Sequence, residues 1–519
     1  MGLLISLAAG RAAGQEPGPP PTAEAEPPKD EVGGALEGID DETLGPAPGA
    51  RTMSLGAVVA LALERNFSLL DQADSVTAAG FRVGVARAEF LPRLTPRFSQ
   101  GSEGTSFGFD VAQKLPWSGG SLEGAGAFTS NEDSQSPVAR SAAATLLVRQ
   151  PLLRGAGPNA TYFDLTNSRR AQEAQERGYE LGRQRLAIQA TSAFYNVIAQ
   201  RQLLTVSRQS LKRSQSLLKA SEARLKVGLA SKLDVFRAEL QAAQTEDSLV
   251  RSEAALESAL EQLRSLLALP PGDNVEPPAV SLMETVTVEP EPLDVLVLQA
   301  LQNRIELHEA RDQVADARRS LSLAKQNLLP QLDATLAVTR LGGGPSFRDA
   351  WNLADTRTTF GVTTSYPLER SADRANRALA EIELTSRQRA LHQRELEVEA
   401  EVRSAVRELL RIRKSVLLQT QAVAVAAQQR RLATLRYERG LASNFDVVDA
   451  EGSLVLARSA LVGLLASYKV AEVELKRATG NLDVAGEFEA PPEGSAEQLG
   501  RGPRVGAGLV RDFDGGAGS

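Results

Sequence analysis

The chain has 519 residues, a formal net charge of −7, no cysteine and only two histidines. Charges of both signs are mixed along it, which leaves no basic surface for nucleic acid, and the missing cysteines exclude disulfides, thiol nucleophiles and cysteine-based zinc sites. No run of 18 apolar residues occurs, so we expect no transmembrane helix, whereas the alternating strands of a membrane barrel would escape this test.

The two ends of the chain differ in composition from its body. We interpret residues 1–14 as a signal-peptide remnant, with a ragged N-terminus as the alternative. Residues 15–50 are rich in Pro, Glu, Ala and Gly without periodic apolar positions, and are predicted to be disordered. The same composition predicts a disordered tail over residues 483–519.

The body begins with helical periodicity and then changes period. The pattern predicts a short helix from Ser54 to Asn66 and a second helix that stops before Pro92, since a residue that precedes proline disfavours the helical conformation. Over residues 106–115, apolar side chains then alternate with small or polar ones. This period of two is typical of strands with one apolar and one polar face.

A very long helix follows, over about 162–227, with a partner helix over about 232–268. At 1.5 Å per residue the long helix spans about 100 Å, too long for one globular core. The same series of elements then recurs. The second set of helices is expected at 293–303, 305–329, 371–439 and 443–479, with strands at 332–339 and 358–366.

The recurrence is an internal duplication. Arg224–Glu239 matches Arg436–Glu451, 212 positions later, at nine of sixteen residues. Further paired landmarks occur in the same order in both copies, namely Phe90-Leu-Pro92 with Leu328-Leu-Pro330 and Gln150-Pro-Leu152 with Tyr366-Pro-Leu368. We therefore expect repeat 1 at 51–270, a linker at 271–291 and repeat 2 at 292–482.

Each copy of the sixteen-residue phrase has the form of a helix break. Its Gly suits the left-handed position after a helix, and its Ser caps the next helix. An Asp three residues after that Ser completes a capping box. The pairs are Ser231 with Asp234 and Ser443 with Asp446.

The strands and their aromatic residues bear on the environment of the sheet. Trp117 and Trp351, the two tryptophans of the chain, lie in or beside the predicted β segments, as aromatic girdles at bilayer interfaces would. A soluble sheet with one buried face would alternate in the same way. Combined with the 100 Å helices, the pattern favours an α+β membrane protein, in which amphipathic strands form a barrel wall.

The two copies differ in their β segments. From Pro92 to Pro151 is 59 positions, but from Pro330 to Pro367 only 37. The excess, around Pro116-Trp-Ser-Gly-Gly120, predicts an additional hairpin in repeat 1 that extends the barrel or its outer loops.

The ordered double set of landmarks resembles the TolC-like outer-membrane efflux protein family, over about residues 51–482. The resemblance implies a homotrimer whose outer-membrane β-barrel continues into a periplasmic α-helical barrel. It implies a passive conduit of a tripartite efflux pump or a type I secretion system, in outer-membrane lipid, with a periplasmic adaptor and an inner-membrane pump as partners. It also implies no catalytic residues and no cofactor.

The resemblance places the helix breaks at the periplasmic tip of the tunnel, where the adaptor docks. The residues carried over as adaptor contacts are Gly228, Leu229, Ala230 and Ser231, and Gly440, Leu441, Ala442 and Ser443. A tight turn with a cap is the structural alternative for both sets.

The resemblance also implies an entrance ring and gate, at Asp446, Asp449, Tyr437 and Asp234. Capping is the alternative role of Asp446 and of Asp234, while Asp449 lies past the cap. The family position of a gating Arg holds Ala442 here, so Arg439 or Lys232 would have to substitute. Because Tyr437 and Asp449 occur only in repeat 2, that repeat is expected to form the gated inner helix pair.

A non-channel periplasmic coiled coil that spans or tethers is the competing hypothesis. It explains the long helices but not the alternating strands with their tryptophans. An enzyme is disfavoured because no clustered catalytic set occurs in the sequence.

Overall fold

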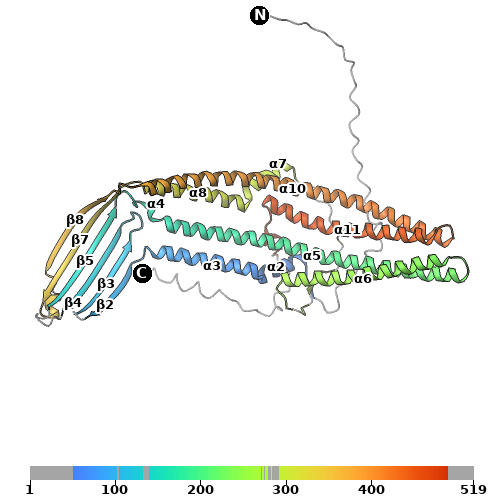
Figure 1. The fold of residues 1–519 in the computed structure, drawn as a ribbon, viewed down its shortest axis with the longest axis horizontal. Helices are drawn as coiled ribbons and strands as arrows, with labels where there is room; N and C mark the ends of the chain where they lie inside the picture. Colours follow the sequence, from blue (N-terminus) through green and yellow to red (C-terminus); the bar gives the residue numbers. More distant parts are fainter. Residues whose placement is uncertain are drawn as a thin grey trace, which may run out of the picture.

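A computed structural model of the chain describes residues 51–101, 104–131, 139–270, 272–273, 275–278, 282 and 291–488. The predicted signal-peptide remnant (1–14), the predicted disordered linker (15–50) and the tail beyond 488 lie outside the described residues. The described part is elongated, with a curved sheet at one end and long helices that extend away from it (Figure 1).

The larger sheet of the described residues has six antiparallel strands in the order β2-β3-β4-β5-β7-β8. These strands are β2 Arg93–Gly101, β3 Gly104–Lys114, β4 Ser121–Asn131, β5 Ala139–Pro151, β7 Gln331–Gly344 and β8 Asp355–Ser365. Repeat 1 therefore supplies four of the described strands and repeat 2 supplies two. This confirms the additional hairpin, β3–β4, which lies within the sheet.

The β3–β4 turn lies at the helix end of the sheet. Strand β2 leaves the C-terminal end of helix α3 (Phe67–Ala88), so β3 returns toward the helices and β4 departs from them again. The amide of Leu115 donates to the carbonyl of Gly120 across this turn, at 2.7 Å. The hairpin thus widens the sheet. Its turn lies at the helix end and is therefore not a loop of the distal end, by which we mean the end of the sheet far from the helices.

Over the middle of the sheet, the strand register separates mostly apolar side chains from mostly small or polar ones. One face carries a row made of Leu94, Val111, Gly124, Leu146, Val338 and Thr358. The next residue of each strand turns to the other face, where the corresponding row is Thr95, Asp110, Ala125, Thr145, Thr339 and Arg357. We call these the apolar face and the polar face, and the register continues both of them over all six strands.

Helices of each repeat follow the predicted pattern to within a few residues. Repeat 1 contains α2 Leu55–Arg65, α3, α5 Phe163–Lys226 and α6 Lys232–Leu266. Repeat 2 contains α7 Leu293–Asn303, α8 Ile305–Gln326, α10 Ser371–Glu438 and α11 Asn444–Thr479. With 64 and 68 residues, α5 and α10 are each about 100 Å long.

The helices form two antiparallel hairpins, α5–α6 and α10–α11, which lie side by side (Figure 1). The main hydrophobic core joins them to α2, with Val59, Phe194, Leu461 and Tyr468 among its buried members. Apolar residues at heptad-like steps along α10 are buried: Val398, Val402, Leu409, Ile412, Val416 and Val423. Burial of a periodic apolar stripe is what holds such long helices in register.

In each repeat, the residue between the two shorter helices is hydrogen-bonded to the C-terminal end of the second hairpin helix, α6 or α11. In repeat 1 the side-chain amide of Asn66 donates to the carbonyl of Leu266, at 3.1 Å. In repeat 2 the guanidinium of Arg304, a buried side chain, donates to the carbonyl of Ala478 at 3.1 Å and to Glu401 at 2.9 Å. The duplication thus extends to tertiary contacts that the sequence comparison does not show.

One expectation needs correction. The tail predicted to be disordered from 483 begins with a helix, α12 Val484–Phe488, because Val484 and Phe488 are buried in the main core. One helix of the described residues, α11, is long and apolar enough by composition to cross a membrane, although no run of 18 apolar residues occurs. Leu454, Leu461 and Leu465 bury its apolar side in the core, so it is a packed core helix.

Shorter elements complete the described fold. The N-terminal β1 Arg51–Thr52 pairs in parallel with β6 Val275–Glu276, inside the predicted linker. Glu276 accepts a hydrogen bond from Arg201 at 2.8 Å, and both side chains are buried. Besides α12, two short helices of the described residues were not predicted: α4 Pro158–Thr161 precedes α5, and α9 Phe347–Trp351 lies between β7 and β8 at the distal end of the sheet.

Candidate functional site: the paired helix tips

The candidate site lies at the ends of the two helical hairpins, remote from the sheet (Figure 1). Each hairpin reverses at its Gly, with φ of 79° at Gly228 and 72° at Gly440. The amide of Leu229 donates to the carbonyl of Arg224, and that of Leu441 to the carbonyl of Arg436, each at 2.8 Å. This is a Schellman turn. The sequence predicts it from the Gly, because a residue with a Cβ is strained at such a φ.

Both predicted capping boxes are present. Asp234 accepts hydrogen bonds from the amide and hydroxyl of Ser231, at 3.1 and 2.7 Å, and Asp446 accepts the same pair from Ser443, at 2.7 and 2.8 Å. These hydrogen bonds lower the pKa of both carboxyl groups below the ordinary value. Capping therefore occupies both carboxylates.

Asp449 has a different environment. Its side chain is exposed on α11, one turn past the cap, and the described residues provide it with no ion pair or side-chain hydrogen bond. The counterpart in repeat 1 is Arg237. The carboxylate is therefore available to an ion or to another chain.

The tips present apolar side chains to the surroundings. Leu229 is 77% exposed and Leu441 is 75% exposed, at matching positions of the two turns. Further exposed apolar residues surround them, namely Val227, Leu233, Phe236 and Phe445. An apolar surface of this kind marks a protein interaction site more often than a solvated turn.

Tyr437 lies between the hairpins and is only 7% exposed, not at an open entrance. Its hydroxyl is 3.1 Å from the hydroxyl of Ser221, and the Arg224 guanidinium lies over its ring at 4.2 Å. Arg224 also donates to the carbonyl of Glu438, at 2.9 Å. Tyr437 therefore contacts an arginine and a serine of α5. The cationic group beside its ring belongs to Arg224 and to neither Arg439 nor Lys232.

Two further contacts join the hairpins near this point. The Asn444 amide donates to the carbonyl of Asp234, at 2.8 Å. Deeper along the helices, Arg213 donates to the buried Glu451, at 2.7 Å. We call Tyr437, Ser221, Arg224 and Asn444 the tip clasp, because together they join the ends of α5–α6 and α10–α11.

The surroundings of the Arg213–Glu451 ion pair, behind the tip clasp, are rich in positive charge. Burial, together with the nearby guanidinium groups of Arg213 and Arg430, lowers the pKa of Arg458, while Glu451 opposes this shift. A cavity of about 390 Å³ lies between the hairpins beside these groups. Tyr437 and Arg224 of the tip clasp line this cavity.

Sequence reasoning missed Ser221, Arg224, Asn444 and Arg213. A signal for Arg224 was present, since it opens the duplicated phrase and Glu451 closes it. The phrase was explained by the turn alone, although its first and last residues contact the neighbouring hairpin. Ser221 lies outside the phrase and carries no recognisable signal.

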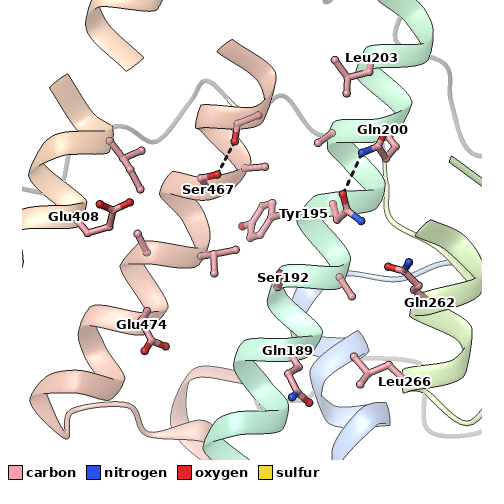
Figure 2. Close-up of a pocket in the computed structure, with 18 of the residues that line it drawn as sticks. Gln189, Ser192, Tyr195, Gln200, Leu203, Gln262, Leu266, Glu408, Ser467 and Glu474 are labelled. Carbon is pink, nitrogen blue, oxygen red and sulfur yellow. Dashed lines mark hydrogen bonds between the residues drawn. The ribbon is translucent and has the colours of Figure 1, made fainter. Parts of the chain in front are cut away.

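A second hollow lies midway along the helices, in a groove of about 820 Å³ between α5 and α11 (Figure 2). Tyr195 points from α5 toward α11, and burial followed by the charge of Glu472 raises its pKa. Amides and small residues line much of the groove, with Gln189, Gln200 and Gln262 among them. Within the described residues, no group of His, Asp and Glu is arranged to hold a metal ion.

The sequence profile of the family described as outer membrane efflux protein matches residues 58–269 and 296–481. The chain belongs to this family. The two matched segments coincide with the two repeats. Members of this family are channels and not enzymes, and the chain is an outer-membrane protein with its helical part in the periplasm.

Comparisons with known proteins agree with this membership. Outer membrane protein TolC of Escherichia coli strain K12 is 24% identical over 333 residues, 62% of this chain and 66% of the relative, just under two thirds of its length. A structure of CusC, described in connection with transmembrane channel formation, superposes with a TM-score of 0.65 and 18% identity, over 83% of this chain and 93% of that one.

The outer membrane protein VceC of Vibrio cholerae gives a TM-score of 0.64 at 18% identity, over 82% of this chain and 96% of that one. These superpositions establish a shared fold.

Proposed function

We propose that the protein is the outer-membrane channel of a tripartite efflux pump or type I secretion system, and that it works as a homotrimer. The observation that carries this proposal is the continuity of a two-faced sheet with helical hairpins about 100 Å long. In a membrane, the apolar face would contact lipid and the polar face would line water. The helices would then carry the conduit across the periplasm.

Strand length supports a membrane location for the sheet. Strands β3 and β4 have 11 residues each, about 36 Å at 3.3 Å per residue. Tilted by about 40°, such strands rise about 28 Å, which matches the apolar band of an outer-membrane barrel. Trp117 and Trp351 are exposed at opposite ends of the sheet, as residues at the two interfaces would be.

The tips are the proposed docking site for a periplasmic adaptor, which would connect the channel to an inner-membrane pump. The contact residues are those of the two turns, Gly228 to Ser231 and Gly440 to Ser443, together with the exposed apolar side chains around them. Leu229 and Leu441 are the most exposed of the apolar side chains at the tips, so they are the proposed anchors.

We also propose that the entrance closes at the tip clasp. Tyr437 and Asn444 on the repeat 2 hairpin hold it against α5, and Asp449 would face the pore, where three copies form a ring of carboxylates. Opening would require the repeat 2 hairpin to leave Ser221 and Arg224. Asp446 and Asp234 serve the caps and are secondary candidates for the ring.

The test begins with a deletion strain, which should become sensitive to toxic small molecules or lose a secreted protein. The protein should fractionate with the outer membrane as a trimer that resists detergent and dissociates on heating. A soluble periplasmic rod would contradict the channel and favour a tethering coiled coil.

The docking site is tested by complementing that strain with a Leu229→Asp/Leu441→Asp double variant. We expect normal outer-membrane trimers, loss of adaptor capture and loss of complementation, because two carboxylates would be placed in an apolar contact. Ser386→Asp adds a charge at an exposed position of α10 far from the tips and serves as the matched control. Full complementation by the double variant would rule out the proposed anchors.

A further inference from the structure

The six-stranded sheet has two free edges. Within the described residues, β2 pairs with β3 alone and β8 with β7 alone. Every residue of β2 is exposed, and so is every residue of β8 except Gly361. Unpaired strand edges are not tolerated in hydrocarbon, because their backbone groups find no water there. Six strands are also fewer than the eight of the smallest membrane barrels, so closure needs another chain.

The two edges fit each other. Strand β2 runs from the helix end toward the distal end of the sheet, while β8 runs back toward the helix end. Placing β8 of one copy beside β2 of the next therefore continues the antiparallel order. The apolar faces also become continuous, because Phe98 on β2 and Phe360 on β8 both belong to that face.

We propose that β2 of each copy pairs with β8 of its neighbour, so that three copies close a barrel of eighteen strands. This inference rests on the homotrimer of the proposed function. The strand number follows from the chain itself, since each copy contributes the six described strands. Had repeat 1 supplied two strands as repeat 2 does, three copies would have closed twelve.

The additional hairpin thus sets the width of the exit. Barrel diameter grows about linearly with strand number, so strands spaced about 4.8 Å apart and tilted about 40° give a diameter of about 36 Å for eighteen strands and about 24 Å for twelve. The cross-section of the backbone ring is then more than doubled.

The side chains that would face the pore are small enough to leave most of this diameter open. The polar face of the added hairpin and its neighbour β5 carries mostly small residues, among them Gly108, Ala112, Ala125, Ala127 and Ala143. Barrels of sixteen to eighteen strands enclose an aqueous channel. The barrel would therefore pass bulky cargo that a twelve-stranded exit excludes, and selection would fall to the helical tips.

The pairing is tested by disulfide cross-linking, for which the chain offers a background without cysteine. Thr95→Cys on β2 is combined in turn with Thr359→Cys, Gly361→Cys or Thr363→Cys on β8, all on the polar face. After oxidation in outer membranes, at least one pair should give a ladder of covalent species that ends at three copies. Thr95→Cys combined with Phe360→Cys, which lies on the opposite face, is the matched control and should stay monomeric on the gel.

Strand number is tested by electron cryomicroscopy of trimers in lipid nanodiscs. We expect eighteen strands in the natural chain and twelve in a variant that lacks residues 104–131, which removes β3 and β4. Should that variant not assemble, the count in the natural chain decides alone. Intact outer-membrane trimers that show twelve strands, or no β2–β8 disulfide with any of the three partners, would overturn the inference and leave the channel in place. Absence of trimers would instead count against the proposed function.

Discussion

Tyr437 shows how one side chain links the two repeats at their tips. Its hydroxyl reaches Ser221 and its ring supports Arg224, so a residue of repeat 2 holds a helix of repeat 1. Its counterpart in repeat 1 is Leu225, which can do neither. The duplication therefore provides two similar turns. The Tyr in place of Leu at this position allows the repeat 2 turn to bind the neighbouring helix.

Removing that side chain should favour the open tip. Tyr437→Ala loses a cation–π contact and a hydrogen bond, together about 1 to 2 kcal/mol, which shifts a closed–open equilibrium about five- to thirtyfold. Single-channel recordings in planar bilayers should show more frequent or larger openings. Tyr366→Ala removes a similar contact, with Arg370 at 4.7 Å beside the sheet, and should leave gating unchanged. Equal effects of both variants would refute the tip clasp as the gate.

Asp449 carries the charge prediction at this scale. If three copies place it around the pore, Asp449→Asn should reduce cation selectivity, seen as a smaller reversal potential in a salt gradient. Asp71→Asn changes the same charge at an exposed position of α3 and should have no effect. Unaltered selectivity in Asp449→Asn would place this residue outside the pore.

Among the elements, the helix breaks were predictable and the contacts between them were not. Gly, Ser and Asp at fixed offsets specify the turn and its cap locally, so the sequence predicts both turns and the bounds of α6 and α11 closely. The tip clasp depends instead on how α5 packs against α10 and α11, more than 200 residues away in sequence. Strand β2 escaped recognition because Pro96 and several polar residues interrupt its alternation, a pattern common at sheet edges.

The capping boxes predict a response of the tips to acid. Because hydrogen bonds lower the pKa of Asp234 and Asp446 in the fold, their stabilisation is present above the ordinary carboxyl pKa of about 4. It is lost as pH falls through the lower, folded values. Hydrogen exchange at 228–236 and 440–448 should therefore accelerate selectively in that acidic range.

A Ser231→Ala/Ser443→Ala variant supplies the control, because it removes the hydroxyl donors. Its tips should exchange faster already at neutral pH and respond less to acid. An identical acid response in both proteins would show that other groups govern the tips.

At the scale of the whole molecule, the duplicated hairpins determine reach. Residues of α5 and α10 extend about 100 Å from the sheet, so the distance from membrane to tip is fixed by helix length. The sequence predicts this dimension well, because long helices with a regular apolar stripe leave a strong signal. It predicts the sheet less completely, since pairing partners and free edges appear only when strands distant in sequence meet.

Shortening the hairpins tests the importance of reach. Deleting seven residues from each of α5, α6, α10 and α11 preserves the heptad pattern and withdraws the tips by about 10 Å. Trimers should still form, while efflux should fall to the level of the deletion strain. Normal efflux would show that the partner protein spans the difference. Reinserting seven unrelated heptad residues in each helix should restore transport.

The two tryptophans can serve as intrinsic fluorescent probes of membrane depth. Trp117 lies in the turn at the helix end of the sheet and Trp351 in α9 at the distal end, and the chain contains no other tryptophan. Replacing either one by phenylalanine leaves a fluorophore at one end alone. The order in which the two emissions shift, and are quenched by brominated lipid, would then time which end of the sheet crosses the bilayer during assembly.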